Sequence, residues 1–173
     1  MSTTDARTDS AGEPVARILD LLDRFHVLVL ACRDAQGSWA APVFFAHSGL
    51  DLFFMSSPAS RHARSLVFDR RLAGAIHGPA NDWHAIVGLQ ISGNTQRLEA
   101  DDVLTAQARY AARFPFADAS NAGFDPALAK ALQKAAWYRL RIDEAVIVDN
   151  AQGLGNRVHW TRPAEGADAP AAG

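Results

Sequence analysis

The chain has 173 residues, of which 49% are hydrophobic and 21% are charged, and its formal net charge is −2 with a pI of about 6.3. This length suits one domain with a sizeable core, and the near-neutral charge argues against general nucleic-acid binding, which depends on a basic surface. No apolar run approaches the ~20 residues that span a membrane, and the polar start MSTTDARTDSAGEP lacks the apolar centre of a signal peptide, so we expect a cytoplasmic protein.

The chain contains one cysteine, Cys32, which excludes an intramolecular disulfide and a zinc site built on several cysteines. Because it ends the apolar run HVLVLAC, we expect Cys32 to be a small core residue. No carboxylate lies at clear metal-ligand spacing, so no metal site is expected.

Both ends of the chain are of low complexity. We expect residues 1–12 and 162–173 to be disordered tails and residues 13–161 to form a single domain, since no internal repeat or linker divides it.

Helix and strand periodicities follow one another through the first half of this domain. The segment EPVARILDLLDRF has apolar residues at helical spacing and predicts an amphipathic helix. Three strands come next, at 26–33, 39–47 and 50–55, and the short turns with glycine between them indicate antiparallel hairpins. A helix running to about Asp69 follows.

The second half is expected to contain four strands and two helices. The expected segments are strands 71–77 and 85–99, helices 100–113 and 125–135, the strand WYRLRIDEAVIVDN, and a last strand within GLGNRVHW. Neighbouring strands are joined too tightly for parallel crossovers. The fold class is therefore mainly β (α+β), with a largely antiparallel sheet closed into a small barrel and helices at its periphery.

The segment FFMSSPASRHARSL (53–66), where the third strand meets the next helix, gathers hydroxyl groups and positive charge. One interpretation is structural: Ser57 caps the helix, Pro58 begins it and the arginines are solvated. The inward stripe of that helix would be Ala59, His62, Ala63, Leu66 and Val67.

The other interpretation of this segment is a phosphate site. Ser56, Ser57 and Ser60 supply hydroxyls, and the first turn of the helix presents free N–H groups at the positive end of its dipole. Arg61 and Arg64 add charge with forked donors, which suit phosphate. Composition alone leaves both interpretations open.

A second pattern lies near the C-terminus, in GNRVHW (155–160). Arg157 and His159 are two residues apart, so in a strand they share one face. Such a pair can bind an anionic substrate or move a proton, and the structural alternative is an ordinary edge strand.

The order of elements and several motifs resemble the pyridoxamine 5′-phosphate oxidase-like FMN-binding split barrels, and within them a small bacterial branch, the YhbP-type proteins. The resemblance covers roughly residues 15–161. SRHARSL is similar to the family's segment that holds the FMN phosphate, and further similarities lie in SGNTQRLE, RFPFA, WYRLRIDE and DNAQGLGNRVHW.

The resemblance implies a six-stranded antiparallel split β-barrel and a homodimer with FMN at its interface. APVFF (41–45) and the end of the third strand, Met55 and Ser56, would together line the flavin ring and ribityl chain. The phosphate would lie at Ser60, Arg61 and His62. The implied FMN-binding residues are Val43, Phe44, Met55, Ser56, Ser57, Ser60, Arg61 and His62. Arg157 and His159 stand where the oxidase proper contacts its substrate.

The sequence differs from the family pattern at three positions: His62 replaces a lysine at the phosphate, Gly88 a glutamine, and Val148 an aromatic residue that meets the flavin. We expect an FMN-dependent oxidoreductase that passes hydride or electrons to a small molecule, with no nucleic-acid or membrane partner. The alternative is a non-catalytic dimer that binds flavin or haem, with His62, His77 or His159 as a haem ligand.

Overall fold

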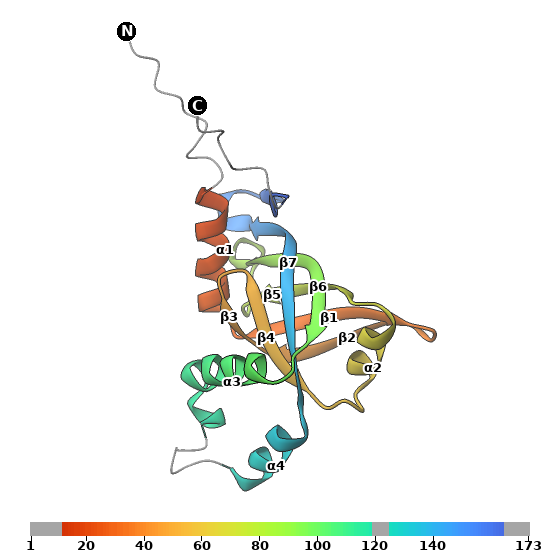
Figure 1. Cartoon of the computed structure of the whole chain (residues 1–173). Helices are drawn as coiled ribbons and strands as arrows, with labels where there is room; N and C mark the ends of the chain where they lie inside the picture. The colour runs from red at the N-terminus through yellow and green to blue at the C-terminus, as the bar shows by residue number, and fades with distance from the viewer. Residues whose placement is uncertain (1–11, 119–124, 165–173) are drawn as a thin grey trace, which may run out of the picture.

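The computed structural model describes residues 12–118 and 125–164 (Figure 1), so most of both predicted tails lies outside the described residues. The α-helices of the described part are α1 (Gly12–Arg24), α2 (Arg61–Phe68), α3 (Asp101–Arg113) and α4 (Pro126–Lys134). Its strands are β1 (Val27–Asp34), β2 (Gly37–Phe44), β3 (Ala46–Ser48), β4 (Asp51–Ser56), β5 (Arg71–His77), β6 (Val87–Arg97), β7 (Ala136–Asp149) and β8 (Arg157–Thr161). Short 3-10 turns lie at Trp83–Ala85, Pro115–Ala117 and Asn150–Gln152.

The strands form one antiparallel sheet with the order β2-β1-β5-β6-β7-β4-β3, and β8 pairs with β7 outside this path. The sheet curls until β2 contacts β4 (Figure 1), as in a split barrel. The mainly β, α+β fold class and the antiparallel pairing are confirmed, because short connections permit only antiparallel neighbours.

The eight strands of the described residues correct the six-stranded barrel that the resemblance implied, and they exceed by one the seven strand segments predicted along the chain. The predicted strand 39–47 breaks at Phe45, whose fully buried side chain turns into the core while its N–H donates to the carbonyl of His26 at 3.2 Å. The chain then resumes as the short β3. At the other end of the domain, β8, which corresponds to the last strand predicted within GLGNRVHW, pairs with the outer half of β7.

A single main core fills the curled sheet, and α1 and α2 pack against it. Ile18 and Leu22 of α1 are fully buried against it, together with Leu28, Leu30, Ile76, Leu140 and Ile147 from the strands. Cys32 is buried, as expected. None of the helices within 12–118 and 125–164 is long and apolar enough to cross a membrane.

A second apolar cluster fixes α3 against β4 and β7. Tyr110 of α3 and Phe114, which follows the helix, lie against Phe53 and Trp137, and the Tyr110 and Trp137 rings meet edge to face at 5.3 Å. Arg113, also on α3, donates to the carbonyls of Leu22, Asp23 and Phe25 at 2.6, 3.1 and 2.8 Å. It thereby ties α3 to the C-terminal end of α1, whose last carbonyls have no helical partner.

Candidate functional site

Helix α2 begins later than the sequence predicted. Its N-cap is Ser60, whose Oγ accepts from the N–H of Ala63 at 3.2 Å, and not Ser57. The residues expected to form the first helical turn form a tight turn instead, closed by the Ser60 N–H donating to the Ser57 carbonyl at 2.9 Å. Pro58 has the fixed φ that the second position of such a turn favours.

The later start also changes which residues of α2 face inward. Ala63 and Leu66 are buried and His62 is half-buried, whereas Ala59 lies outside the helix and Val67 is 81% exposed. The predicted inward stripe is therefore right at its centre and wrong at its ends.

Three predicted site residues come together at the start of α2. The Oγ of Ser56 lies 2.6 Å from Nε2 of His62 and 3.0 Å from Oγ of Ser60, and Ser60 Oγ lies 3.2 Å from the same His62 nitrogen. Ser56 ends β4, Ser60 is the cap and His62 lies in the first turn, so one short segment supplies all three. We call these residues the serine–histidine cluster.

Burial lowers the pKa of His62 below its ordinary value, so the imidazole is neutral near pH 7. Neutral imidazole carries one N–H donor, and each serine hydroxyl can both donate and accept. Within the described residues no carboxylate bonds His62, so the cluster lacks the group that orients the base of a hydrolytic triad. The cluster is thus suited to binding an anion through hydroxyl and imidazole donors.

The Arg61 guanidinium points away from this cluster. Its Nε and Nη2 donate to the carboxylate of Asp34 at 2.7 and 2.9 Å, and it lies over the ring of Trp39, 4.7 Å from the ring centroid. This hydrogen bonding lowers the pKa of Asp34 to about 2. Asp34 and Trp39 were not singled out from the sequence, since no local signal links them to a helix so far along the chain.

Two residues expected at the flavin, Val43 and Phe44, belong to β2. As consecutive strand residues they point to opposite faces. Val43 packs against the main core, while Phe44, which is 46% exposed, meets Phe114 and Phe116 at ring distances of 5.3 and 5.4 Å.

The other two, Met55 and Ser57, flank Ser56. Met55 packs against the second apolar cluster, the one that contains Tyr110 and Trp137. The Ser57 side chain is exposed in the turn before α2.

Arg157 and His159 lie exposed on β8, on one face as expected, but far from the serine–histidine cluster within this chain. Ser56 pairs with Ala136 at one end of β7, and Arg157 pairs with Val148 at the other. Twelve strand residues correspond to roughly 40 Å along the strand. One chain therefore does not unite the two predicted groups.

Gly88, where the resemblance implied a glutamine in the oxidase, lies where three strands pack closely together. Gly88 pairs with Val148 on β7, and Val148 pairs with Arg157 on β8. A Cβ at Gly88 would lie 2.3 Å from the carbonyl oxygen of Ile76 and 2.9 Å from Cβ of His77. This position has no room for a glutamine side chain unless β5 and β6 shift.

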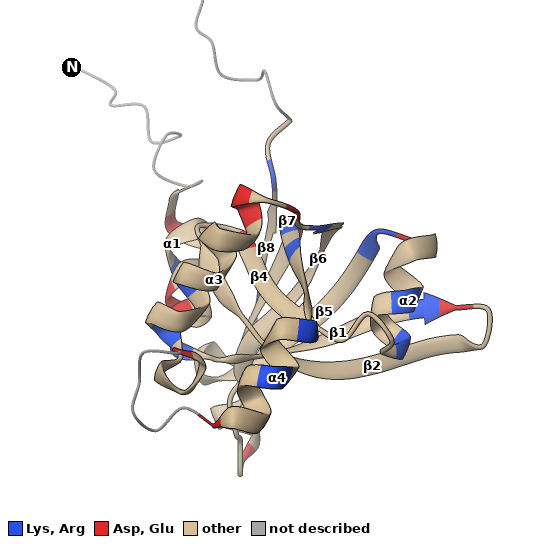
Figure 2. Cartoon of the chain, turned by 60° about the horizontal axis from the view of Figure 1, so that its bottom comes forward, with Lys and Arg blue, Asp and Glu red and all other residues tan. Residues whose placement is uncertain are grey.

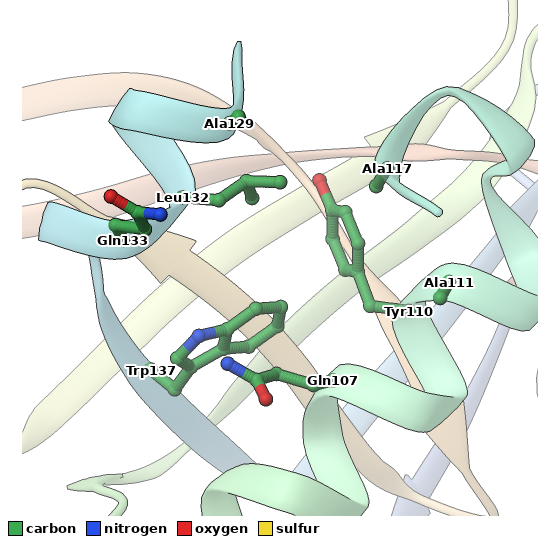
Figure 3. A pocket seen from close by; sticks show the side chains of 8 residues that line it. All are labelled: Gln107, Tyr110, Ala111, Ala117, Ala129, Leu132, Gln133 and Trp137. Atoms are coloured by element: carbon green, nitrogen blue, oxygen red, sulfur yellow. The ribbon is translucent and has the colours of Figure 1, made fainter. Parts of the chain in front are cut away.

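A cavity of about 280 Å³ lies between α3, α4 and the start of β7 (Figure 3). The Trp137 indole and Tyr110 phenol line it with Leu132 (Figure 3). The indole N–H has no acceptor among the described residues, and burial raises the pKa of Tyr110 to about 12, so its hydroxyl stays protonated. Such a lining suits an uncharged, largely apolar molecule. No group of three His, Cys, Asp or Glu that could hold a metal occurs in 12–118 or 125–164.

No family model matches the sequence. It is 28% identical over 152 residues to a UPF0306 protein of Serratia proteamaculans, and the matched region covers 87% of this chain and 96% of that protein. A second UPF0306 protein, from Yersinia pseudotuberculosis, is 28% identical over 148 residues and covers 82% of this chain and 92% of its own length.

Solved structures share the fold at low sequence identity. A heme binding protein from Mycobacterium smegmatis superposes with a TM-score of 0.66 at 24% identity, covering 88% of this chain and 58% of that one. A putative pyridoxamine 5′-phosphate oxidase from Listeria innocua gives 0.59 at 16% identity, covering 79% and 98%. A FAD-binding protein from Mesorhizobium loti gives 0.58 at 16% identity, covering 75% and 90%. The resemblance to oxidase-like split barrels, and to the UPF0306 (YhbP-type) proteins among them, is confirmed.

Proposed function

We propose that this protein binds FMN, with the phosphate at the start of α2, and acts as an oxidoreductase that passes hydride or electrons to a small molecule. The observation that carries the proposal is the serine–histidine cluster, where two hydroxyls and an imidazole meet within 3.2 Å at the positive end of a helix. These are groups that bind phosphate. Similarity to a FAD-binding protein and to a putative pyridoxamine 5′-phosphate oxidase supports a flavin.

The cluster fits a phosphate through neutral donors more than through charge. His62 is neutral at physiological pH, and the charge of Arg61 is offset by Asp34. Arg64, also on α2, is an exposed cation without a carboxylate partner among the described residues, and it donates to the carbonyl of Ala59. FMN would supply the redox chemistry, while the residues of this chain would hold its phosphate and orient it.

We further propose that the functional unit is a homodimer. The cluster and the Arg157–His159 pair lie toward opposite ends of β7, so only a second copy could bring the pair of one chain to the cluster of another. His159 and Arg157 are exposed on β8, where they are available to bind an anionic substrate or to move a proton. Light scattering with and without FMN tests this, and a monomer under both conditions would contradict it.

Flavin retention tests the cofactor directly. Protein saturated with FMN and then desalted should keep a bound flavin spectrum at micromolar concentration, and loss of all flavin would refute the proposal.

Arg61→Gln and Asp34→Asn form a matched pair, because both break the same ion pair and only the first removes a cation. If Arg61 turns to the phosphate on binding, Arg61→Gln weakens FMN binding by about 1–3 kcal/mol and Asp34→Asn does not. Equal losses would mean that the ion pair serves the scaffold alone.

Haem is the second candidate, supported by the similarity to a heme binding protein. His159 is exposed, and within the described residues its ring nitrogens form no hydrogen bond, so it is the best placed of the three candidate ligands. By contrast, Ser56 contacts His62, and Nδ1 of His77 lies 3.0 Å from the Gly78 carbonyl. A haem titration should then give a Soret shift that His159→Ala removes and His77→Ala keeps. No shift in the wild type would dismiss haem.

A further inference from the structure

A cavity of about 430 Å³ lies between α2 and the C-terminal end of β6, and its walls differ in character. The α2 side is apolar and consists of Pro58, Ala63, Leu66 and Val67. The opposite side is polar and consists of Arg70, Thr95, Gln96, Arg97, Glu99 and Tyr138. A molecule that fits both walls must have an apolar body and a polar group.

Thr95 is the buried polar residue of this cavity. The residue is 4% exposed, and its hydroxyl has no hydrogen-bond partner among the described residues. A buried hydroxyl without a partner is costly, and nearly all such groups in folded proteins are paired. The Thr95 N–H donates to the carbonyl of Arg70 at 2.7 Å, so Arg70 is held beside it.

Two arginines give the polar wall its charge. Within 12–118 and 125–164, neither Arg70 nor Arg97 has a carboxylate partner, in contrast to Arg61, which Asp34 holds. Thr95 and Arg97 are two apart in β6 and therefore share a face, and Arg97 pairs with Tyr138 across the β6–β7 ladder. Glu99 offsets one of the two charges and leaves the wall positive. Figure 2 shows basic segments on and beside α2.

We propose that this cavity binds a small organic anion. Its phosphate or carboxylate group contacts the guanidinium groups of Arg70 and Arg97 and accepts a hydrogen bond from Thr95, and its apolar body lies against Leu66 and Val67. Forked guanidinium donors suit both kinds of anion. The site is separate from the proposed FMN site, because Ser56, Ser60 and His62 do not line it.

Calorimetric titration with phenyl phosphate, benzoate, phenol and inorganic phosphate tests the proposal. We expect phenyl phosphate or benzoate to bind at one site per chain, phenol not to bind, and inorganic phosphate to bind more weakly because it has no apolar body. The preference between phenyl phosphate and benzoate identifies the anionic group. No binding of either aryl anion would overturn the proposal.

Variants then locate the site. Arg70→Gln and Arg97→Gln should each weaken binding of the preferred aryl anion by at least about tenfold, since each removes a charge-assisted contact. Arg109→Gln makes the same change of charge at an exposed position of α3 and should leave binding unchanged. Equal effects of all three variants would point to general electrostatic attraction and overturn the assignment.

Thr95→Val separates binding from scaffold, because valine keeps the shape and removes only the hydroxyl. We expect binding to weaken about fivefold or more while the melting temperature stays the same or rises, since an unpartnered buried hydroxyl is lost. Unchanged binding would contradict the assigned role of Thr95.

The same arginine variants test whether this site is separate from the FMN site. The separation would be overturned if Arg70→Gln and Arg97→Gln lost FMN retention and FMN displaced phenyl phosphate. Failure of the wild type to retain FMN would leave this cavity's test intact.

Discussion

The carboxylate of Asp34 and the guanidinium of Arg61 meet in a forked ion pair, with N–O distances of 2.7 and 2.9 Å, across 27 residues of sequence. The pair joins the end of β1 to the first turn of α2, and Arg61 also covers the ring of Trp39. It therefore holds in place the helix start on which Ser60 and His62 lie.

Asp34→Asn should lower the stability of the protein near neutral pH, and the difference from the wild type should shrink in acid. Arg61 holds the pKa of Asp34 at about 2, below its usual 3.8, so the folded state favours the ionised carboxylate. The stabilisation is present above about pH 4 and is lost as the pH falls toward about 2. Urea unfolding at several pH values measures it, and a difference that does not vary with pH would contradict the prediction.

His62→Lys should tighten FMN binding by about tenfold near neutral pH. Burial keeps His62 neutral, whereas a lysine that reaches solvent adds a permanent charge at the proposed phosphate site. His77→Lys makes the same substitution at an exposed histidine of β5 and serves as the control. Flavin fluorescence titration gives both affinities, and a similar gain in both variants would show that overall charge is responsible.

Arg113→Lys should destabilise the fold by about 1–3 kcal/mol. A single guanidinium nitrogen, Nη2, donates to three carbonyls at the end of α1, and the guanidinium lies over the ring of Phe45, 5.0 Å from its centroid. Lysine has a shorter side chain and no planar group to stack on that ring. Arg109→Lys, at an exposed position of the same helix, should have little effect. Chemical denaturation compares the two variants, and equal stabilities would mean that the contacts to α1 contribute nothing.

Gly88→Ala should destabilise the protein by about 1–3 kcal/mol, because a Cβ there overlaps the backbone of β5. Gly12→Ala, where a Cβ would meet nothing within 4 Å, is the matched control. Thermal unfolding distinguishes them. If Gly88→Ala were as stable as Gly12→Ala, the prediction would be wrong, and β5 and β6 would have room for a Cβ at this position.

The order of the helices and strands, and the local part of the candidate site, could be predicted from the residues alone. Apolar periodicity and glycine turns predicted the helices and strands to within a few residues, except that β2 and β3 were expected as one strand, and short turns required antiparallel pairing. Ser56, Ser60 and His62 meet because they lie within seven residues around one strand end and one helix start.

The contacts between segments far apart in the chain could not be predicted in this way. The break at Phe45, the Asp34–Arg61 pair and the meeting of Arg70 with Thr95 depend on how far the sheet curls and on the register of its strands. Register and curvature arise from the packing of the whole core, to which no local pattern of residues corresponds. For the same reason, the long strand β7 keeps Arg157 and His159 away from the serine–histidine cluster of their own chain.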